Sequence, residues 1–123
     1  MGSAGTNSKV LIVDDEADIR SFTRTVLERR GYEVLEADDG IPAYELITRL
    51  SGGIQVLVTD IRMPGMDGIA LAEKVSAAYP KIKILYISGF ASEPPKRRRP
   101  GHRFLPKPFV AGELVKCVES LTG

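Results

Sequence analysis

Short runs of apolar residues alternate along this chain with longer segments in which hydrophobic residues recur every three or four positions. The short runs are apolar on both faces and are bounded by turn residues, which is typical of strands buried inside a sheet. The longer segments have the spacing of amphipathic helices. The pattern predicts five strands, over residues 9–13, 32–37, 54–60, 82–88 and 102–105.

Helices are expected in the segments that separate and follow these strands. Glycine after a basic last turn at Gly31, and Pro80 further on, are typical helix ends, and Asp39 is placed to cap a helix start. The residues expected to face the core are Ile19, Phe22, Val26 and Leu27; Ala43, Leu46, Ile47 and Leu50; Ile69, Ala72 and Val75; and Val110, Leu114, Val118 and Leu121. Strands that alternate with helices predict an α/β protein with a parallel sheet covered on both faces.

The composition is that of one globular domain. Its formal net charge of +1 gives no indication of a nucleic-acid or membrane partner, and no apolar run approaches the roughly 20 residues of a membrane-spanning helix. The single cysteine, Cys117, cannot form an internal disulfide and suits a reducing cytoplasm, where we expect the protein to act. Residues 1–8 lack the apolar segment of a signal peptide and are interpreted as a tag or linker before a domain over 9–123.

Polar residues follow the ends of four of the predicted strands. They are Asp14 and Asp15 after the first strand, Asp60 at the end of the third, Ser88 at the end of the fourth and Lys107 after the fifth. Because the carboxyl ends of parallel strands meet at one edge of a sheet, we expect these side chains to gather there.

Taken singly, each of these residues also has an ordinary role as a helix cap, a turn residue or a solvated lysine. Two carboxylates about 4 Å apart repel by roughly 4 kcal/mol at an effective dielectric of about 20, so three together need a compensating charge. All-oxygen ligation favours Mg²⁺ or Mn²⁺ over zinc. A carboxylate beside such an ion, a hydroxyl and a lysine is an arrangement suited to phosphoryl transfer, with aspartate as the nucleophile.

Four motifs, in this order, resemble those of response-regulator receiver domains of two-component signalling, of the chemotaxis-regulator type. They are Val-Asp-Asp-Glu at 13–16, the nine residues at 60–68, Ser-Gly at 88–89 and Lys-Pro-Phe at 107–109. The resemblance covers residues 9–121. It implies a flavodoxin-like fold, a doubly wound five-stranded parallel sheet in the order 2-1-3-4-5.

The resemblance also implies a metal site for Mg²⁺, with Mn²⁺ as the alternative ion. Asp15 matches the direct ligand of the family, and Asp14 matches a ligand that often acts through water. Asp60 and the backbone carbonyl of Arg62 match the remaining protein ligands.

The residues of a phosphorylation switch follow from the same resemblance. Asp60 matches the phosphoacceptor and Lys107 the lysine that pairs with the phosphoryl group, next to a Pro108 whose preceding bond is usually cis. Ser88 matches the hydroxyl that turns toward the phosphoryl group. Phe104 matches the aromatic ring that moves inward with it.

The chain is therefore interpreted as a phosphorylation-dependent signalling switch and not as an enzyme, although it assists its own phosphorylation and dephosphorylation. The implied partner is a histidine kinase or a phosphotransfer protein, and the motifs around Ser88 and Lys107 resemble receivers fused to hybrid sensor histidine kinases. Two alternatives stay open, a receiver that docks without phosphorylation and an Mg²⁺-dependent aspartyl-phosphate phosphatase. Such phosphatases carry an aspartate two residues after the nucleophile, where this chain has Arg62.

The segment over residues 90–103 departs from the family pattern. Its prolines flank a basic run at 96–99, so the helix expected there by family likeness is predicted to be shortened, missing or mobile. The run is interpreted either as a surface for an acidic partner or as a solvated loop, and a short cationic run binds nucleic acid only weakly. Arg62 and Phe90 flank the route of hydrolytic water and are hypothesised to lengthen the lifetime of the acyl phosphate.

Overall fold

A computed structural model describes residues 8–89 and 101–122 of the chain as a single sheet with helices on both faces. The elements, in order, are β1 (Lys9–Val13), α1 (Ala17–Arg29), β2 (Glu33–Ala37), α2 (Gly40–Arg49), β3 (Val56–Asp60), α3 (Gly68–Ala78), β4 (Lys83–Ser88), β5 (His102–Pro106) and α4 (Ala111–Thr122). All five strands are parallel and lie in the order β2-β1-β3-β4-β5. The predicted fold class, strand order and strand positions are confirmed.

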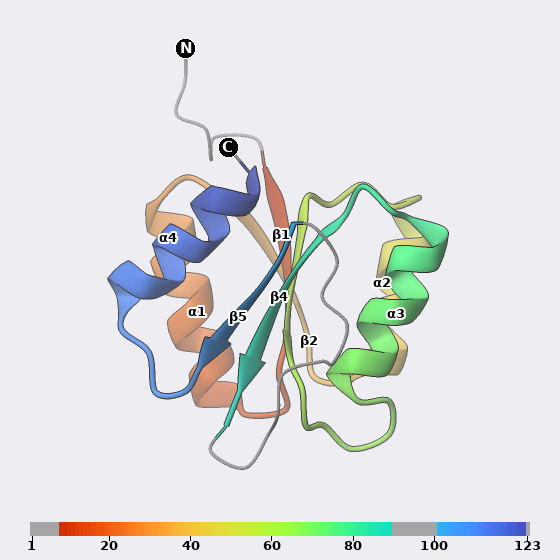
Figure 1. Cartoon of the computed structure of the whole chain (residues 1–123), viewed down its shortest axis with the longest axis horizontal. Coiled ribbons are helices and arrows are strands. Elements are labelled where there is room, and N and C mark those ends of the chain that lie inside the picture. The colour runs from red at the N-terminus through yellow and green to blue at the C-terminus, as the bar shows by residue number, and fades with distance from the viewer. Residues whose placement is uncertain (1–7, 90–100, 123) are drawn as a thin grey trace.

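The two faces of the sheet bury separate hydrophobic clusters, as Figure 1 shows, with α1 and α4 over one face and α2 and α3 over the other. Successive strand residues alternate between them: Leu11 and Val13 join the α2–α3 side, and Val10 and Ile12 join the α1–α4 side. All residues of β3 are buried. Burial of each of its apolar residues, Val56, Leu57 and Val58, stabilises the fold by about 1.5–3 kcal/mol relative to exposure, so the end of β3 is a rigid place for a functional group.

The inner stripe of α1 is rotated from the one that the sequence pattern predicts. Thr23 and Leu27 are buried, whereas the phenyl ring of Phe22 is 42% exposed. The ring instead lies against Phe109, with ring centroids 6.1 Å apart. The prediction for Phe22 was wrong because the apolar pattern did not count the buried hydroxyl residue Thr23.

The prediction that Val110 faces the core was also wrong, since its side chain is 65% exposed. The helix α4 begins one residue later, and the Val110 carbonyl accepts bonds from the amides of Glu113 and Leu114. Val110 therefore contributes its backbone carbonyl to the first turn of the helix, and its side chain lies outside the row of residues that α4 buries.

Turn residues end the helices largely as expected. Gly31 has a φ of 93°, a backbone conformation that favours glycine. The carboxylate of Asp39 accepts the amide of Ile41 at the start of α2, which confirms the predicted cap. The predictions for Phe90, for the basic run at 96–99 and for a helix between β4 and β5 fall on residues 90–100, outside the described residues, as does the assignment of residues 1–7.

Candidate functional site

The loop after β1 holds its first aspartate at several points. The Asp14 amide donates to the carbonyl of Ala37 at 3.2 Å. Its carbonyl accepts a bond of 2.7 Å from the guanidinium of Arg20, and its carboxylate accepts the amide of Glu16 at 2.9 Å. Asp14 is buried, whereas its neighbour Asp15 is exposed. The loop therefore presents one carboxylate inside the protein and one at its surface.

Asp60 ends β3 and is 5% exposed. The helix α3 starts directly against it: a Cβ atom on Gly68 would lie 1.9 Å from the Asp60 carbonyl oxygen. The Gly68 amide donates to the carbonyl of Ile61 at 2.8 Å, which fixes this approach. Only glycine fits at position 68, so the loop that surrounds Asp60 depends on it.

Four acidic residues and one lysine gather at the carboxyl edge of the sheet, and we call this group the acidic site: Asp14, Asp15, Glu16, Asp60 and Lys107. Carboxylate oxygens of the three aspartates all lie within 4.8 Å of one another. The ammonium of Lys107 lies 2.9 Å from Glu16, 3.2 Å from Asp14 and 3.3 Å from Asp60. The amide of Lys107 donates to the Ser88 carbonyl at 2.7 Å. The Lys107–Pro108 bond is cis, as the resemblance implied.

Two opposing effects set the pKa values of the aspartates in the site: the burial of their carboxylates and the positive charge of Lys107. Burial is the main cause that raises the pKa values of Asp14 and Asp60 above their ordinary range, while Lys107 lowers them. For Lys107, burial lowers the pKa, but the hydrogen bond to Glu16 and the charges of Asp14 and Asp60 outweigh it and raise the pKa overall. The lysine therefore stays protonated beside carboxylates that it only partly neutralises.

A divalent cation fits the residues present. The Oδ2 atom of Asp14 is buried and, among the described residues, has no hydrogen-bond partner. Its nearest cation is the Lys107 ammonium at 3.2 Å, which Glu16 and Asp60 also contact. A buried carboxylate oxygen that shares one ammonium, next to two further carboxylates, is a ligand set for a hard cation such as Mg²⁺.

The remaining predicted residues lie on β4, on β5 and in the loop after β3. Ser88 is buried at the end of β4, next to the Asp60 strand, and its hydroxyl donates to the Gly89 carbonyl at 3.0 Å. Phe104 is half-buried on β5 opposite Tyr86 and packs on the α2–α3 side of the sheet. The side chain of Arg62 is exposed.

Sequence reasoning assigned no role to two residues that the structure brings to this site. Glu16 binds Lys107, and Arg20 binds the carbonyl of Asp14. The sequence held one signal for these contacts. Arg20 follows Glu16 by one helical turn, which places Arg20 next to the loop that holds Asp14 and Asp15.

A family model for the response regulator receiver domain matches residues 10–119, and the chain belongs to this family. Receiver domains of two-component systems are in general signalling switches and not classical enzymes. Among the described residues, no helix is both long and apolar enough to cross a membrane.

Named relatives agree with this assignment. The chain is 36% identical to the response regulator receiver protein CpdR of Brucella abortus, over 92% of this chain and 95% of that protein. It is equally 36% identical to the sensor kinase CckA of the same organism, but spans only 12% of that protein's length. The crystal structure of the receiver domain from the hybrid histidine kinase CckA is 33% identical and superposes with a TM-score of 0.82, over 94% of this chain and all of that one.

Proposed function

We propose that this receiver domain is a phosphorylation-dependent switch in which Asp60 accepts a phosphoryl group from a histidine kinase or a phosphotransfer protein in the cytoplasm. The observation that carries the proposal is the Lys107 ammonium, 3.3 Å from Asp60 and 3.2 Å from Asp14, beside converging carboxylates. An aspartate that is to act as a nucleophile must stay ionised although it is buried, and the ammonium favours the ionised form.

In the proposed reaction a carboxylate oxygen of Asp60 forms a bond to phosphorus while the bond from phosphorus to the donor's imidazole nitrogen breaks. The electron pair of that bond leaves with the imidazole, and the product is an acyl phosphate. Lys107 balances charge on the transferred group. Mg²⁺, held by Asp14, Asp15, Asp60 and the carbonyl of Arg62, supplies further charge neutralisation when bound.

The proposed relay runs from Ser88 to Phe104. Ser88 pairs with Pro106 on β5, and Phe104 lies two residues before Pro106, about 7 Å along the strand. A hydroxyl that turned from the Gly89 carbonyl toward a phosphoryl group would vacate space at this end of β4 and β5. The half-buried ring of Phe104 is placed to respond to that change.

The proposal is tested by incubation with Mg²⁺ and acetyl phosphate, followed by intact-mass measurement. One added phosphoryl group is expected, and Asp60→Asn should abolish the addition. Asp38→Asn is the matched control, because Asp38 is an exposed aspartate at the end of β2 and should leave the uptake unchanged.

Other outcomes of the same experiment favour the other functions. A folded chain that takes up no phosphoryl group would instead be a docking receiver. Steady release of phosphate from a generic phosphate ester would indicate a phosphatase, a function that the exposed Arg62 at the second position after Asp60 does not favour.

A further inference from the structure

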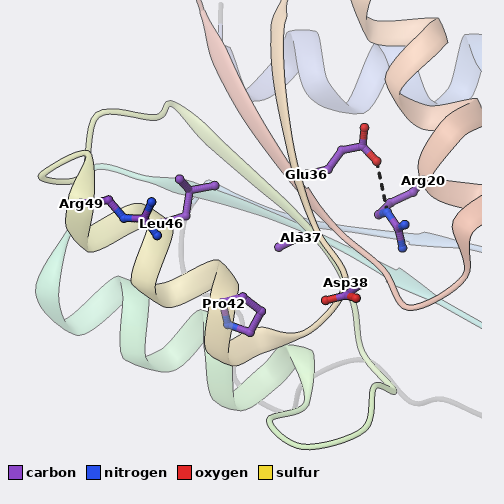
Figure 2. A pocket seen from close by; sticks show the side chains of 7 residues that line it. All are labelled: Arg20, Glu36, Ala37, Asp38, Pro42, Leu46 and Arg49. Carbon is purple, nitrogen blue, oxygen red and sulfur yellow. Dashed lines mark hydrogen bonds and ion pairs between the residues drawn. The ribbon is translucent and has the colours of Figure 1, made fainter.

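Arg20 joins the acidic loop to the outer strand of the sheet. Its Nη1 atom donates to the Asp14 carbonyl at 2.7 Å and its Nε atom donates to the carboxylate of Glu36 on β2 at 3.1 Å. Figure 2 shows this pair in the wall of a surface groove of about 410 Å³ between β2 and α2. The Arg20 side chain is only 21% exposed, so the guanidinium is held in place at both ends.

Arg20 is the residue that holds the Asp14 carbonyl in the acidic loop. The Asp14 amide is held by Ala37, and its carboxylate accepts the Glu16 amide in a turn that already restricts the backbone from Asp14 to Glu16. Because a peptide unit is planar, the direction of the Asp14 carbonyl also sets the nitrogen and Cα positions of Asp15. The bond from Arg20 therefore adds a second restraint on the peptide from which the exposed carboxylate of Asp15 extends.

The positive charge of Arg20 is balanced by carboxylates close to it. We call the group of Arg20, Arg24, Glu28 and Glu36 the arginine brace. Glu36 also pairs with Arg24, which in turn pairs with Glu28 at 3.0 Å. The brace contains two cations and two carboxylates, so it supplies a directed hydrogen bond without a net positive charge that would repel a metal ion.

We propose that Arg20 is a positioning residue for the cation site, which orients the Asp14–Asp15 peptide so that the carboxylates of Asp14, Asp15 and Asp60 converge. The inference rests on the proposed function, because that function requires a divalent cation at these carboxylates. Residues that orient a metal ligand without binding the metal themselves typically change metal affinity by about 10- to 100-fold when they are mutated.

The test measures Mn²⁺ affinity by electron paramagnetic resonance on the full chain. Arg20→Met keeps the aliphatic stem but removes every donor, and should weaken Mn²⁺ binding about 10-fold. A purely electrostatic role has the opposite sign, because loss of a cation would strengthen binding of another cation.

Arg24→Met is the matched control. Arg24 lies on the same helix and binds the same Glu36, but among the described residues its side chain pairs with Glu28 and Glu36 and not with the acidic loop. This variant should change Mn²⁺ affinity less than about 2-fold, and melting in EDTA should show both variants folded. If Arg20→Met does not fold, Glu36→Leu takes its place, since it removes the acceptor of the Arg20 Nε–H and should also weaken binding.

Equal Mn²⁺ affinity in Arg20→Met and the unmodified chain would overturn the inference, as would an equal loss in Arg24→Met. The proposed function is judged separately by acetyl phosphate uptake. Mn²⁺ binding without uptake would refute that function and leave the role of Arg20 intact, whereas an unmodified chain that binds no Mn²⁺ would refute both.

Discussion

Two groups of charged residues lie close together in this domain, and they are built in opposite ways. In the arginine brace, cations and carboxylates are equal in number and each carboxylate accepts a bond from an arginine. In the acidic site, Asp14, Glu16 and Asp60 share one ammonium, and the carboxylate of Asp15 lies beside those of Asp14 and Asp60. Arg20 links the two groups, because its side chain donates to the Asp14 carbonyl and its amide donates to the Glu16 carbonyl.

The two groups also differ in the pKa values of their carboxylates. Hydrogen bonds from Arg24 and Arg20 lower the pKa of Glu36, which means that its charged form stabilises the fold. Burial raises the pKa values of Asp14 and Asp60, which means that their charged forms oppose folding. Buried carboxylates with raised pKa values at the edge of a sheet are typical of functional sites, which agrees with the proposed function.

The largest expected effect comes from removal of the shared cation. Lys107→Met keeps the length of the side chain but leaves buried carboxylates without their ammonium, and it should cost about 3 kcal/mol of unfolding free energy in EDTA. Mg²⁺ should recover much of that loss, because it replaces the missing positive charge. Urea unfolding with and without Mg²⁺ measures both effects.

The control for this variant is Lys116→Met, on the exposed surface of α4, which should change stability by less than about 0.5 kcal/mol. A Lys107→Met protein as stable as the unmodified chain in EDTA would show that the carboxylates do not need their cation, and the contrast between the two groups would disappear.

A smaller effect of opposite sign is expected at Asp60. Its charged form opposes folding, so Asp60→Asn should raise the Tm in EDTA by about 3–6 °C, or roughly 1 kcal/mol for a domain of this size. In the unmodified chain Mg²⁺ should raise the Tm, and this gain should shrink in the variant, which has lost one ligand. Scanning calorimetry gives both values, and a lower Tm for Asp60→Asn in EDTA would contradict the prediction.

The sequence alone predicted the parts of this molecule that depend on strands. Buried runs are easy to recognise, and the rule that parallel strands end at one edge was enough to bring Asp14, Asp60 and Lys107 together. Helix orientation was harder, because a helix can rotate by one residue when a buried threonine replaces an apolar side chain. Phe22 was misplaced for that reason.

The contacts of Glu16 and Arg20 were harder to predict from the sequence. Their spacing of one helical turn indicates that the two residues lie close together, but not that Glu16 binds Lys107 or that Arg20 binds a backbone carbonyl. Their roles arise from two things that a one-dimensional pattern does not contain, the direction of a long side chain and the carboxylate on a neighbouring strand that receives it. Hydrogen bonds to the backbone of a loop are the hardest part of such a site to predict, since any residue type can supply the carbonyl.

The smallest expected effect lies in the arginine brace and depends on pH. Glu36→Gln should cost about 0.5–1 kcal/mol at neutral pH, since the side chain is partly exposed and its ion pairs are screened by solvent. The pKa of Glu36 is lowered from its ordinary value of 4.5, so its stabilisation is fully present above 4.5 and is lost as the pH falls through the lowered value. The difference between the variant and the unmodified chain should therefore shrink only below that pH.

Urea unfolding in EDTA at several pH values between neutral and about pH 3.5 measures this difference. Glu33→Gln, at an exposed position on the same strand β2, is the control and should show little difference at any pH. A Glu36→Gln penalty that stays constant through the pH at which the Glu36 carboxylate itself titrates, followed by NMR, would mean that Glu36 contributes by packing and not by charge. Glu36 would then hold Arg20 through packing contacts and not through opposite charge. The arginine brace and the acidic site would differ in how deeply their carboxylates are buried, and not in the balance of positive and negative charges.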